Sequence, residues 1–373
     1  MSASKDIYVT LGDYIEQCDE RNSDGKYTID DAMGMTITKE IIPTKADLKD
    51  NDLSKFWVVK PKEFVYNPRT HGKKIGLGFN NSNNPFIISW NNIAFRVKDP
   101  SSLLPDYLYI TVCREEWDRN ACFRSWGSST EVFSWNEFSL MRIPLPSIEI
   151  QRELVATYNG LRALAEQNEA LIEPLSKACE AFIVDCKTKY PEVELGKYIE
   201  EFDKRNNAGC EYPFYGINKD KTFMPTVADT NNLDNTKYKV VSSGDFVFSG
   251  MQTGRDVCIR IALYNGVNSI IISPAYTTFK VKDDVKILPQ YLFLQFKRFE
   301  MDRYGWFLSD GSIRSNLEWE RFCEIKLPLP PMETQRSIVN LYNCLEEAKK
   351  IASEAREKLK TLCPALVQRA ANS

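Results

Sequence analysis

Short apolar runs separated by polar clusters fill the first part of the chain. Runs at 56–59, 64–66, 87–90 and 94–97 are rich in Val, Ile, Phe and Trp, and clusters of Asn, Gly and Pro lie between them. Such runs are typical of sheet strands and their turns. Pro105 stands before an apolar segment, where a proline can begin a helix. The pattern predicts a mixed α/β (α+β) region.

After residue 146 the pattern changes to that of a long helix with a coiled-coil seam. Apolar positions follow one another at alternating spacings of four and three, and a looser version returns after residue 331. Pro174 is expected to kink the first helix, because an interior proline removes a backbone hydrogen bond. The expected seam consists of Leu154, Tyr158, Leu161, Ala165, Asn168, Ile172, Leu175, Cys179 and Phe182, and then of Ile338, Tyr342, Leu345, Ala352, Leu359 and Leu366.

The same order of patterns occurs twice, at an offset of 184 residues. The segment that begins Leu11-Gly12 returns at Leu195-Gly196, and Pro144-Leu145-Pro146 with its Glu-x-Gln-Arg returns at 328–336. This period far exceeds that of a solenoid repeat, so each copy is expected to close its own core. We therefore predict a pseudo-two-fold protein with domains at 1–146 and 188–330 and helical spacers at 147–187 and 331–373.

Charge and connectivity favour antiparallel pairing of the two helices. Residues 148–186 carry seven acidic and three basic side chains and residues 332–369 carry five and seven, which gives net charges of −4 and +2. Opposite charge favours pairing of one helix with the other. A parallel pair would force the second domain to span about 58 Å of helix. The alternative is that each helix packs only on its own domain.

Composition limits the chemistry of the chain. It has 373 residues, 43% of them hydrophobic, and a net charge of −3, so any nucleic-acid contact must come from local patches. Ten cysteines occur without a C-x-x-C pair and His71 is the single histidine, which argues against disulfides, zinc and a nucleophile–histidine pair. The chain shows neither a membrane-spanning run nor a secretory signal, so a cytoplasmic location is expected.

The duplicated motifs resemble a known family. Ile143-Pro144-Leu145-Pro146 and its second copy, each followed by Glu-x-Gln-Arg and a long helix, together with the Leu-Gly-x-Tyr-Ile-Glu openings, are similar to the specificity subunits of type I restriction-modification enzymes. The resemblance covers nearly the whole chain. It implies two target-recognition domains that alternate with two helical segments, and helices that act as a ruler between two DNA half-sites read in opposite directions.

The resemblance also implies partners and a division of labour. The chain would read a bipartite sequence in double-stranded DNA and recruit two methyltransferase subunits and the ATP-dependent restriction subunits. It would perform no chemistry and bind no cofactor, because S-adenosylmethionine, ATP and Mg²⁺ would be held by those partners. An enzyme is disfavoured because the methyltransferase-like Asn83-Asn84-Pro85-Phe86 lacks a second proline and a cofactor fold. The remaining alternative is a duplicated coiled-coil scaffold without DNA binding.

Two kinds of loop are candidate DNA contacts. Gly72-Lys73 aligns with Gly254-Arg255 just beyond a strand, where amides and a cation can approach phosphate. Gly127-Ser128 and Gly311-Ser312 precede Trp135 and Trp319 and suit backbone contacts, and nearby arginines could read guanine edges. Arg119 and Arg303 follow aspartates and are expected to form structural ion pairs with them. The candidates are Arg69, Lys73, Lys74, Arg124, Ser128, Ser129, Arg255, Arg260, Ser312 and Arg314.

Overall fold

The computed structural model describes residues 7–71, 74–127, 131–226, 229–230, 233–251, 253–311 and 315–372. The chain forms two compact units: unit 1 holds residues 1–168 and 351–373, and unit 2 holds residues 169–350. Each unit therefore contains one mixed domain and parts of both long helices. The domain of unit 1, between Tyr8 and Pro144, is called head one, and that of unit 2, between Glu192 and Pro328, is called head two. The predicted mixed α/β class with two long helices is confirmed.

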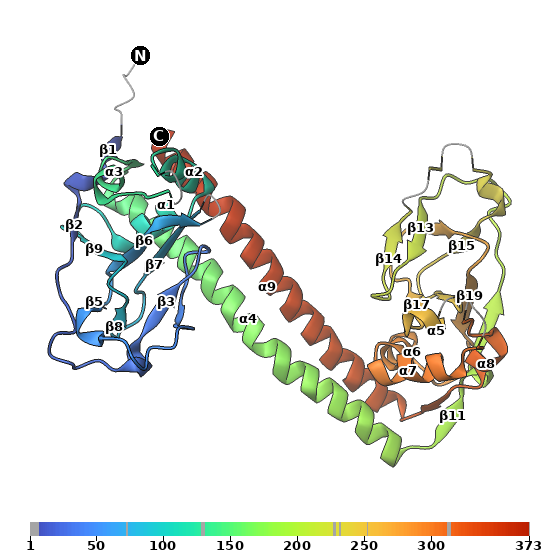
Figure 1. Cartoon of the computed structure of the whole chain (residues 1–373). Helices are drawn as coiled ribbons and strands as arrows, with labels where there is room; N and C mark the ends of the chain where they lie inside the picture. Colours follow the sequence, from blue (N-terminus) through green and yellow to red (C-terminus); the bar gives the residue numbers. More distant parts are fainter. Residues whose placement is uncertain are drawn as a thin grey trace. The chain divides into compact units, whose positions relative to one another are not determined.

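Head one is built around an antiparallel sheet in the order β2-β9-β6-β7. Its strands are β2 (Ile15–Gln17), β9 (Ile93–Val97), β6 (Phe64–His71) and β7 (Lys74–Phe79). Three short pairs surround it: β1 (Tyr8–Thr10) with β10 (Arg142–Pro144), β3 (Met33–Met35) with β4 (Ile41–Pro43), and β5 (Trp57–Val59) with β8 (Phe86–Ile88). The helices are α1 (Pro105–Val112), α2 (Glu115–Phe123) and α3 (Trp135–Ser139) (Figure 1).

Head two repeats this plan. Its corresponding sheet has the order β12-β19-β16-β17, formed by β12 (Ile199–Phe202), β19 (Thr277–Val281), β16 (Phe246–Ser249) and β17 (Arg260–Leu263). A second sheet contains β14 (Phe223–Pro225), β13 (Phe214–Ile217), β18 (Ile270–Ile272) and β15 (Lys239–Val241), and β11 (Glu192–Glu194) pairs with β20 (Lys326–Pro328). The helices are α5 (Thr253–Asp256), α6 (Pro289–Phe296), α7 (Phe299–Leu308) and α8 (Trp319–Cys323).

Equivalent aromatic clusters fill the two cores. In head one, Phe95 and Tyr66 from the sheet contact Phe138 of α3 at ring-centroid distances of 5.0 and 4.6 Å. In head two, Phe279 and Phe248 contact Phe322 of α8 at 5.7 and 4.3 Å. Aromatic contacts of this kind add to the free energy gained by burying the rings. The repeat in the sequence thus encodes a repeated core.

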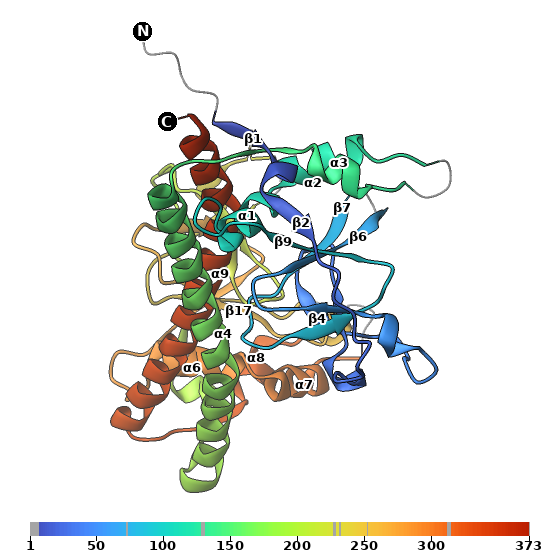
Figure 2. The same cartoon turned by 90° about the vertical axis from the view of Figure 1, so that its left-hand side faces the viewer.

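The long helices are α4 (Ile148–Lys189) and α9 (Met332–Asn372). The beginning of α4 and the end of α9 lie in unit 1, and the other two halves lie in unit 2, so the two helices run in opposite directions within each unit. Figures 1 and 2 show them side by side in unit 1. Helix α4 continues through Pro174, and α9 contains Pro364.

Each head buries side chains from both long helices. Val367 of α9 is fully buried in the core of head one, against which Leu154, Tyr158, Leu161 and Leu359 also pack. Ile183 and Cys186 of α4 join Ile338 of α9 in the core of head two. The alternative in which each helix packs only on its own domain is therefore wrong. Phe182 was expected in the seam but is 49% exposed, because Ile183 turns toward the head instead.

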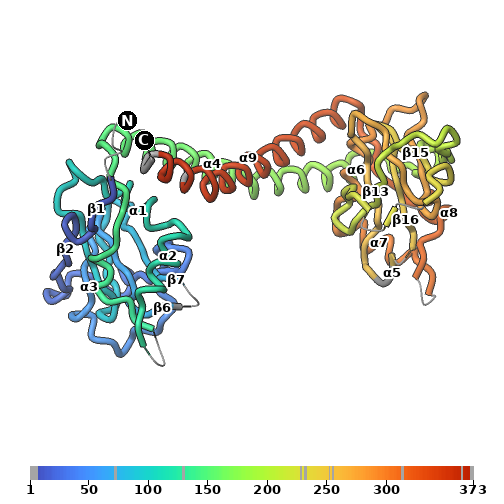
Figure 3. Tube along the Cα trace, turned by 90° about the horizontal axis from the view of Figure 1, so that it is seen from above, coloured from blue at the N-terminus to red at the C-terminus, as the bar shows by residue number. Residues whose placement is uncertain are grey.

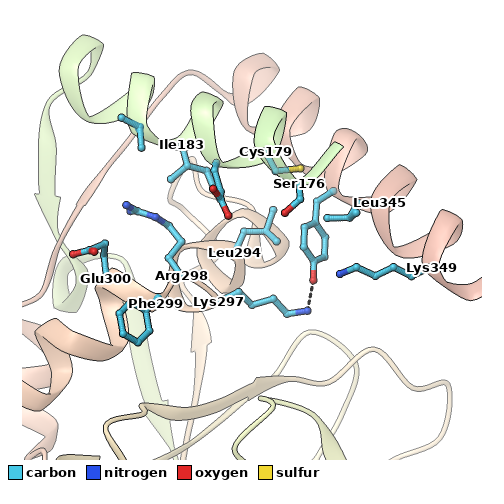
Figure 4. Close-up of a pocket in the computed structure, with 13 residues that line it drawn as sticks. Ser176, Cys179, Ile183, Leu294, Lys297, Arg298, Phe299, Glu300, Leu345 and Lys349 are labelled. Atoms are coloured by element: carbon cyan, nitrogen blue, oxygen red, sulfur yellow. Dashed lines mark hydrogen bonds between the residues drawn. The ribbon is translucent and has the colours of Figure 1, made fainter. Parts of the chain in front are cut away.

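In unit 2, a cavity of about 600 Å³ lies where head two meets the two long helices. Ile183 and Leu294 line it from α4 and α6, and Leu345 lines it from α9 (Figure 4). Lys297 lies over the ring of Tyr342 and donates a hydrogen bond to its hydroxyl group. Burial lowers the pKa of Lys297, which the nearby Glu346 carboxylate partly offsets.

The glutamine of the Glu-x-Gln-Arg motif joins each head to its helix. Gln151 is fully buried, accepts a hydrogen bond from the Leu104 N–H at 2.9 Å, and donates to the carbonyl groups of Ser102 and Pro146 at 3.0 and 2.9 Å. Gln335 makes the equivalent three bonds, with Leu288 N–H at 2.8 Å and the carbonyls of Lys286 and Pro330 at 2.9 Å. The duplicated motif therefore has a structural role.

A close approach explains the glycine in the Leu-Gly motif. A Cβ on Gly12 would lie 2.9 Å from the Cβ of Ser139, and a Cβ on Gly196 would lie 2.9 Å from that of Cys323. These contacts bring the start of each head against α3 or α8. A side chain at either glycine would push that helix away from the aromatic core.

Thiol accessibility provides a test of the packing. Burial raises the pKa of Cys18 and Cys113 to about 12, whereas the side chains of Cys210 and Cys344 are exposed. Because the thiolate is the reactive form, we expect iodoacetamide to modify Cys210 and Cys344 in the native protein well before Cys18 and Cys113. Peptide mass spectrometry after a short reaction at neutral pH measures this order. Early modification of Cys18 would contradict the packing of head one, and denatured protein provides the control.

Candidate nucleic-acid interface

The two candidate loops of head one meet at one end of the sheet. Thr70 on β6 donates its N–H to the carbonyl of Glu131 at 3.1 Å, and Phe133 donates to the carbonyl of Pro68 at 2.7 Å. Trp126 and Val132 pair across the loop between α2 and α3. The α2–α3 loop and the β6–β7 hairpin therefore form one continuous surface, although about sixty residues separate them in the chain. Figures 2 and 3 show both elements at the same end of head one.

Head two brings the corresponding segments together in a different shape. Leu317, which follows α7, donates its N–H to the carbonyl of Gly250 after β16 at 2.9 Å. The β16–β17 connection is longer than the β6–β7 hairpin and contains the short helix α5. A Cβ on Gly250 would lie 2.0 Å from the carbonyl oxygen of Leu317, so this contact requires glycine. The two heads thus present equivalent but differently shaped surfaces.

The predicted contact residues differ in how their side chains are held. Arg69 and Lys74 are exposed on the hairpin. Arg124 is held by Glu137 at 3.1 Å and by Asn120 at 3.3 Å, and Arg260 is held by Asp256 at 2.5 Å. An ion pair therefore holds each of these two guanidinium groups. Arg255 lies in α5, where its backbone but not its side chain is described, and the remaining candidates lie outside the described residues: Lys73, Ser128, Ser129, Ser312 and Arg314.

A buried ion pair lies next to the candidate loops in each head. Asp118 of α2 binds Lys39 at 2.6 Å and accepts a hydrogen bond from the Ile75 N–H at 3.3 Å. Asp302 of α7 makes the same contacts with Lys221 at 2.6 Å and with the Ile259 N–H at 2.9 Å. Each pair therefore fixes a helix against the strand that leads away from the candidate loop.

The lysines of these pairs adopt left-handed backbone conformations in hairpin turns. The φ angles are 66° at Lys39 and 60° at Lys221, a region that costs a non-glycine residue free energy. The long side chain is required to reach the aspartate, so lysine stands where glycine would be less strained. The structural ion pairs expected for Arg119 and Arg303 are not those observed: the neighbouring aspartates bind lysines, Arg119 is exposed, and Arg303 lies 3.5 Å from Glu300 at the surface.

The sequence interpretation missed two exposed phenylalanines. Phe123 at the end of α2 is 86% exposed, and Phe307 near the end of α7 is 79% exposed. They stand 184 residues apart, which is the offset of the repeat, and each is followed two and four residues later by serine and glycine. The repeat offset therefore contained the signal, but only the structure shows that these rings have no place in the core.

The described residues also bear on metal binding and on nucleophilic groups. Within that part of the chain, no group of three or more His, Cys, Asp or Glu side chains is placed to hold a metal ion. Burial raises the pKa of Cys258, the thiol that lies beside Lys221, which disfavours its nucleophilic form. None of the described helices has the length and apolar character needed to cross a membrane.

Comparison with solved structures identifies the class of fold. The S subunit of a type I restriction-modification system from M. genitalium superposes with a TM-score of 0.60 at 14% identity, over 99% of this chain and 98% of that one. The HsdS subunit from Thermoanaerobacter tengcongensis gives a TM-score of 0.41 at 17% identity, over 98% and 96% of the two chains. No curated protein sequence matches the chain. The protein has the fold of a type I specificity subunit.

A family model also matches the second repeat. Residues 192–361 match the model of the type I restriction modification DNA specificity domain. Over these residues the chain is similar to that domain, and the duplicated motifs gave the same resemblance. The match begins at β11 and runs through head two into α9.

Proposed function

We propose that this chain is the DNA-specificity subunit of a type I restriction-modification system and reads a bipartite target. The observation that carries this proposal is the repeated surface, formed in each head by the convergence of the β6–β7 or β16–β17 connection with the loop after α2 or α7. The family domain at residues 192–361 supports it. Because the two surfaces differ in shape, the half-sites they read are expected to differ in sequence.

The proposal includes partners that carry out the chemistry. Two methyltransferase subunits bind the chain, and ATP-dependent restriction subunits join that complex. S-adenosylmethionine, ATP and Mg²⁺ belong to these partners, and this chain acts by binding. The lengths of α4 and α9 set the spacing between half-sites, since a helix rises by about 1.5 Å per residue. The proposed location is the cytoplasm, because the chain must meet chromosomal DNA there.

A methylation map provides the decisive test of this function. Adenine methylation is compared across the genome between the host and a strain from which this gene is deleted. A bipartite motif that loses methylation only in the deletion strain is the expected result. Complementation with the intact gene should restore it. The proposal fails if the two maps are identical while the methyltransferase gene is expressed.

Charge removal on the hairpin should weaken DNA binding and flatten its salt dependence. For Arg69→Ala and Lys74→Ala we expect weaker binding by the assembled methyltransferase complex, with the slope of log affinity against log salt reduced by about one for each phosphate that is no longer neutralised. Fluorescence anisotropy between about 50 and 200 mM salt measures both quantities. Lys49→Ala removes an exposed charge elsewhere in head one and is the matched control. Unchanged slopes for both hairpin variants would exclude the hairpin from the footprint.

A further inference from the structure

Phe123 and Phe307 recur in the repeat without a packing reason. The serine that follows each of them is explained by its contacts, because Ser125 donates to the carbonyl of Ala121 and Ser309 donates to that of Gly305, both at 2.8 Å. The phenylalanine rings have no such role, being 86% and 79% exposed. The ring of Phe307 does contact Tyr304 at 6.5 Å between centroids, but Tyr304 is itself 40% exposed, so the pair enlarges the exposed patch.

Keeping such a ring in water has a cost that a binding partner would remove. Burial of a phenylalanine side chain removes apolar surface from water, which is favourable. An isolated exposed aromatic residue requires no explanation. Here, however, the same ring is exposed at the same position in both heads, although the residues beside it differ: Cys122 and Arg124 in head one, Trp306 and Leu308 in head two. This recurrence indicates a partner that both heads contact in the same way.

An arginine accompanies each ring. Arg119 and Arg303 precede Phe123 and Phe307 by four residues, so each pair lies on one face of its helix. Since the neighbouring aspartates bind Lys39 and Lys221, neither arginine is needed in the buried ion pair. The patch on each helix therefore combines a surface cation with an exposed ring. This combination suits a phosphate group beside a base, because every base presents an aromatic face.

The patch lies beside the candidate DNA-binding loops. Asp118 fixes α2 against Ile75, near the start of β7, and the loop that leaves α2 then pairs with Arg69 and Thr70 on β6. In head two, α7 lies so close to Ile259, the residue before β17, that a Cβ on Gly305 would come within 2.3 Å of its side chain. Both rings thus sit on the helix turn that leads into the converged loops of their head.

We propose that Phe123 and Phe307 are paired base-contacting residues, each inserted at a base step of its own half-site while Arg119 or Arg303 binds the adjacent phosphate. Phenylalanine is among the apolar side chains that proteins wedge between base steps, where partial unstacking opens the duplex. The inference rests on the proposed function and adds to it a specific contact that both heads share. It also predicts that half-sites are distinguished partly by how easily one step unstacks.

The test uses the full chain assembled with its methyltransferase subunits and a duplex that carries the methylated motif found in the genome. Phe123→Ala and Phe307→Ala are each expected to weaken binding by about tenfold, as expected when one base has no stacking partner. Because stacking releases no counterions, the salt slope should stay that of the wild type, whereas Arg119→Ala and Arg303→Ala should reduce it by about one. Phe→Trp should retain most of the affinity at both positions.

A fluorescent base gives an independent measure of insertion. A duplex with 2-aminopurine placed in turn at each step of a half-site should brighten on binding at one step, and Phe→Ala in the corresponding head should abolish that signal. Phe299→Ala is the matched control, since Phe299 is 69% exposed on the same helix as Phe307 but corresponds to Glu115 in head one. It should leave affinity and fluorescence unchanged.

The possible outcomes separate this inference from the proposed function. If the wild-type complex binds no motif, the proposed function fails before the phenylalanines are tested. If the wild type binds its motif and both alanine variants bind equally well, the inference is wrong and the function stands. A third outcome is that the Phe→Ala variants bind DNA more weakly and assemble less well with the methyltransferase, while the Phe→Leu variants bind normally. This result would identify a protein contact of the rings and would also overturn the inference.

Discussion

Asp118→Asn is expected to lower the free energy of unfolding of unit 1 by about 3–5 kcal/mol, because it leaves the Lys39 ammonium group buried without a counter-charge. The side chains of Lys39 and Asp118 are only 3% and 10% exposed, and their charged atoms are 2.6 Å apart. Asparagine can still accept the hydrogen bond from Ile75, so the variant isolates the removal of charge. Asp302→Asn should have the same effect on unit 2, where Lys221 and Asp302 are 6% and 14% exposed.

Chemical denaturation followed by tryptophan fluorescence measures this effect, and two further variants interpret it. Arg119→Ala, one residue away on the exposed face of α2, should change stability by less than about 0.5 kcal/mol. Lys39→Met combined with Asp118→Asn removes the buried charge and should recover a large part of the stability, as expected when the unpaired ion is the cause. Equal destabilisation in the single and double variants would show that poorer packing is responsible instead.

Gln151→Ala should destabilise unit 1 by about 2–4 kcal/mol, because it leaves a buried N–H and two carbonyl groups without partners. The three bonds join the start of α4 to the segment before α1 and to Pro146 of the Pro-Leu-Pro motif. Removal of these bonds should also loosen the helix from its head. Hydrogen exchange at the Leu104 amide is therefore expected to accelerate more than exchange in the β6–β9 core.

The same motif contains its own control. Arg152 follows Gln151 directly and is exposed, so Arg152→Ala should leave both stability and exchange near the wild-type values. Gln335→Ala and Arg336→Ala repeat the comparison in unit 2, where the three bonds of Gln335 have the same geometry. A stable Gln151→Ala variant would show that water can replace the amide, and that the motif is kept for another reason.

The repeat, the class of fold and the two long helices can be predicted from the residue order alone. These features depend on local periodicity and on the similarity of one half of the chain to the other, both of which are written directly in the residue order. It also marked Gln151 and Gln335 through the duplicated motif, but not their three hydrogen bonds, because their partners lie up to 49 residues away. The residue boundaries of the heads and spacers stay predictions of the sequence.

Which residues of the repeat pack together, and which are exposed, became clear only from the folded chain. Lys39 and Asp118 are 79 residues apart, and Val367 follows head two in the chain but fills the core of head one. A local pattern in the sequence cannot show such contacts, because the packing of the whole core decides which distant segments meet. Some of the repeated residues are buried and stabilise a head, whereas others are exposed. Phe123 and Phe307 look like core residues in the sequence, and only the folded chain shows that their rings are exposed.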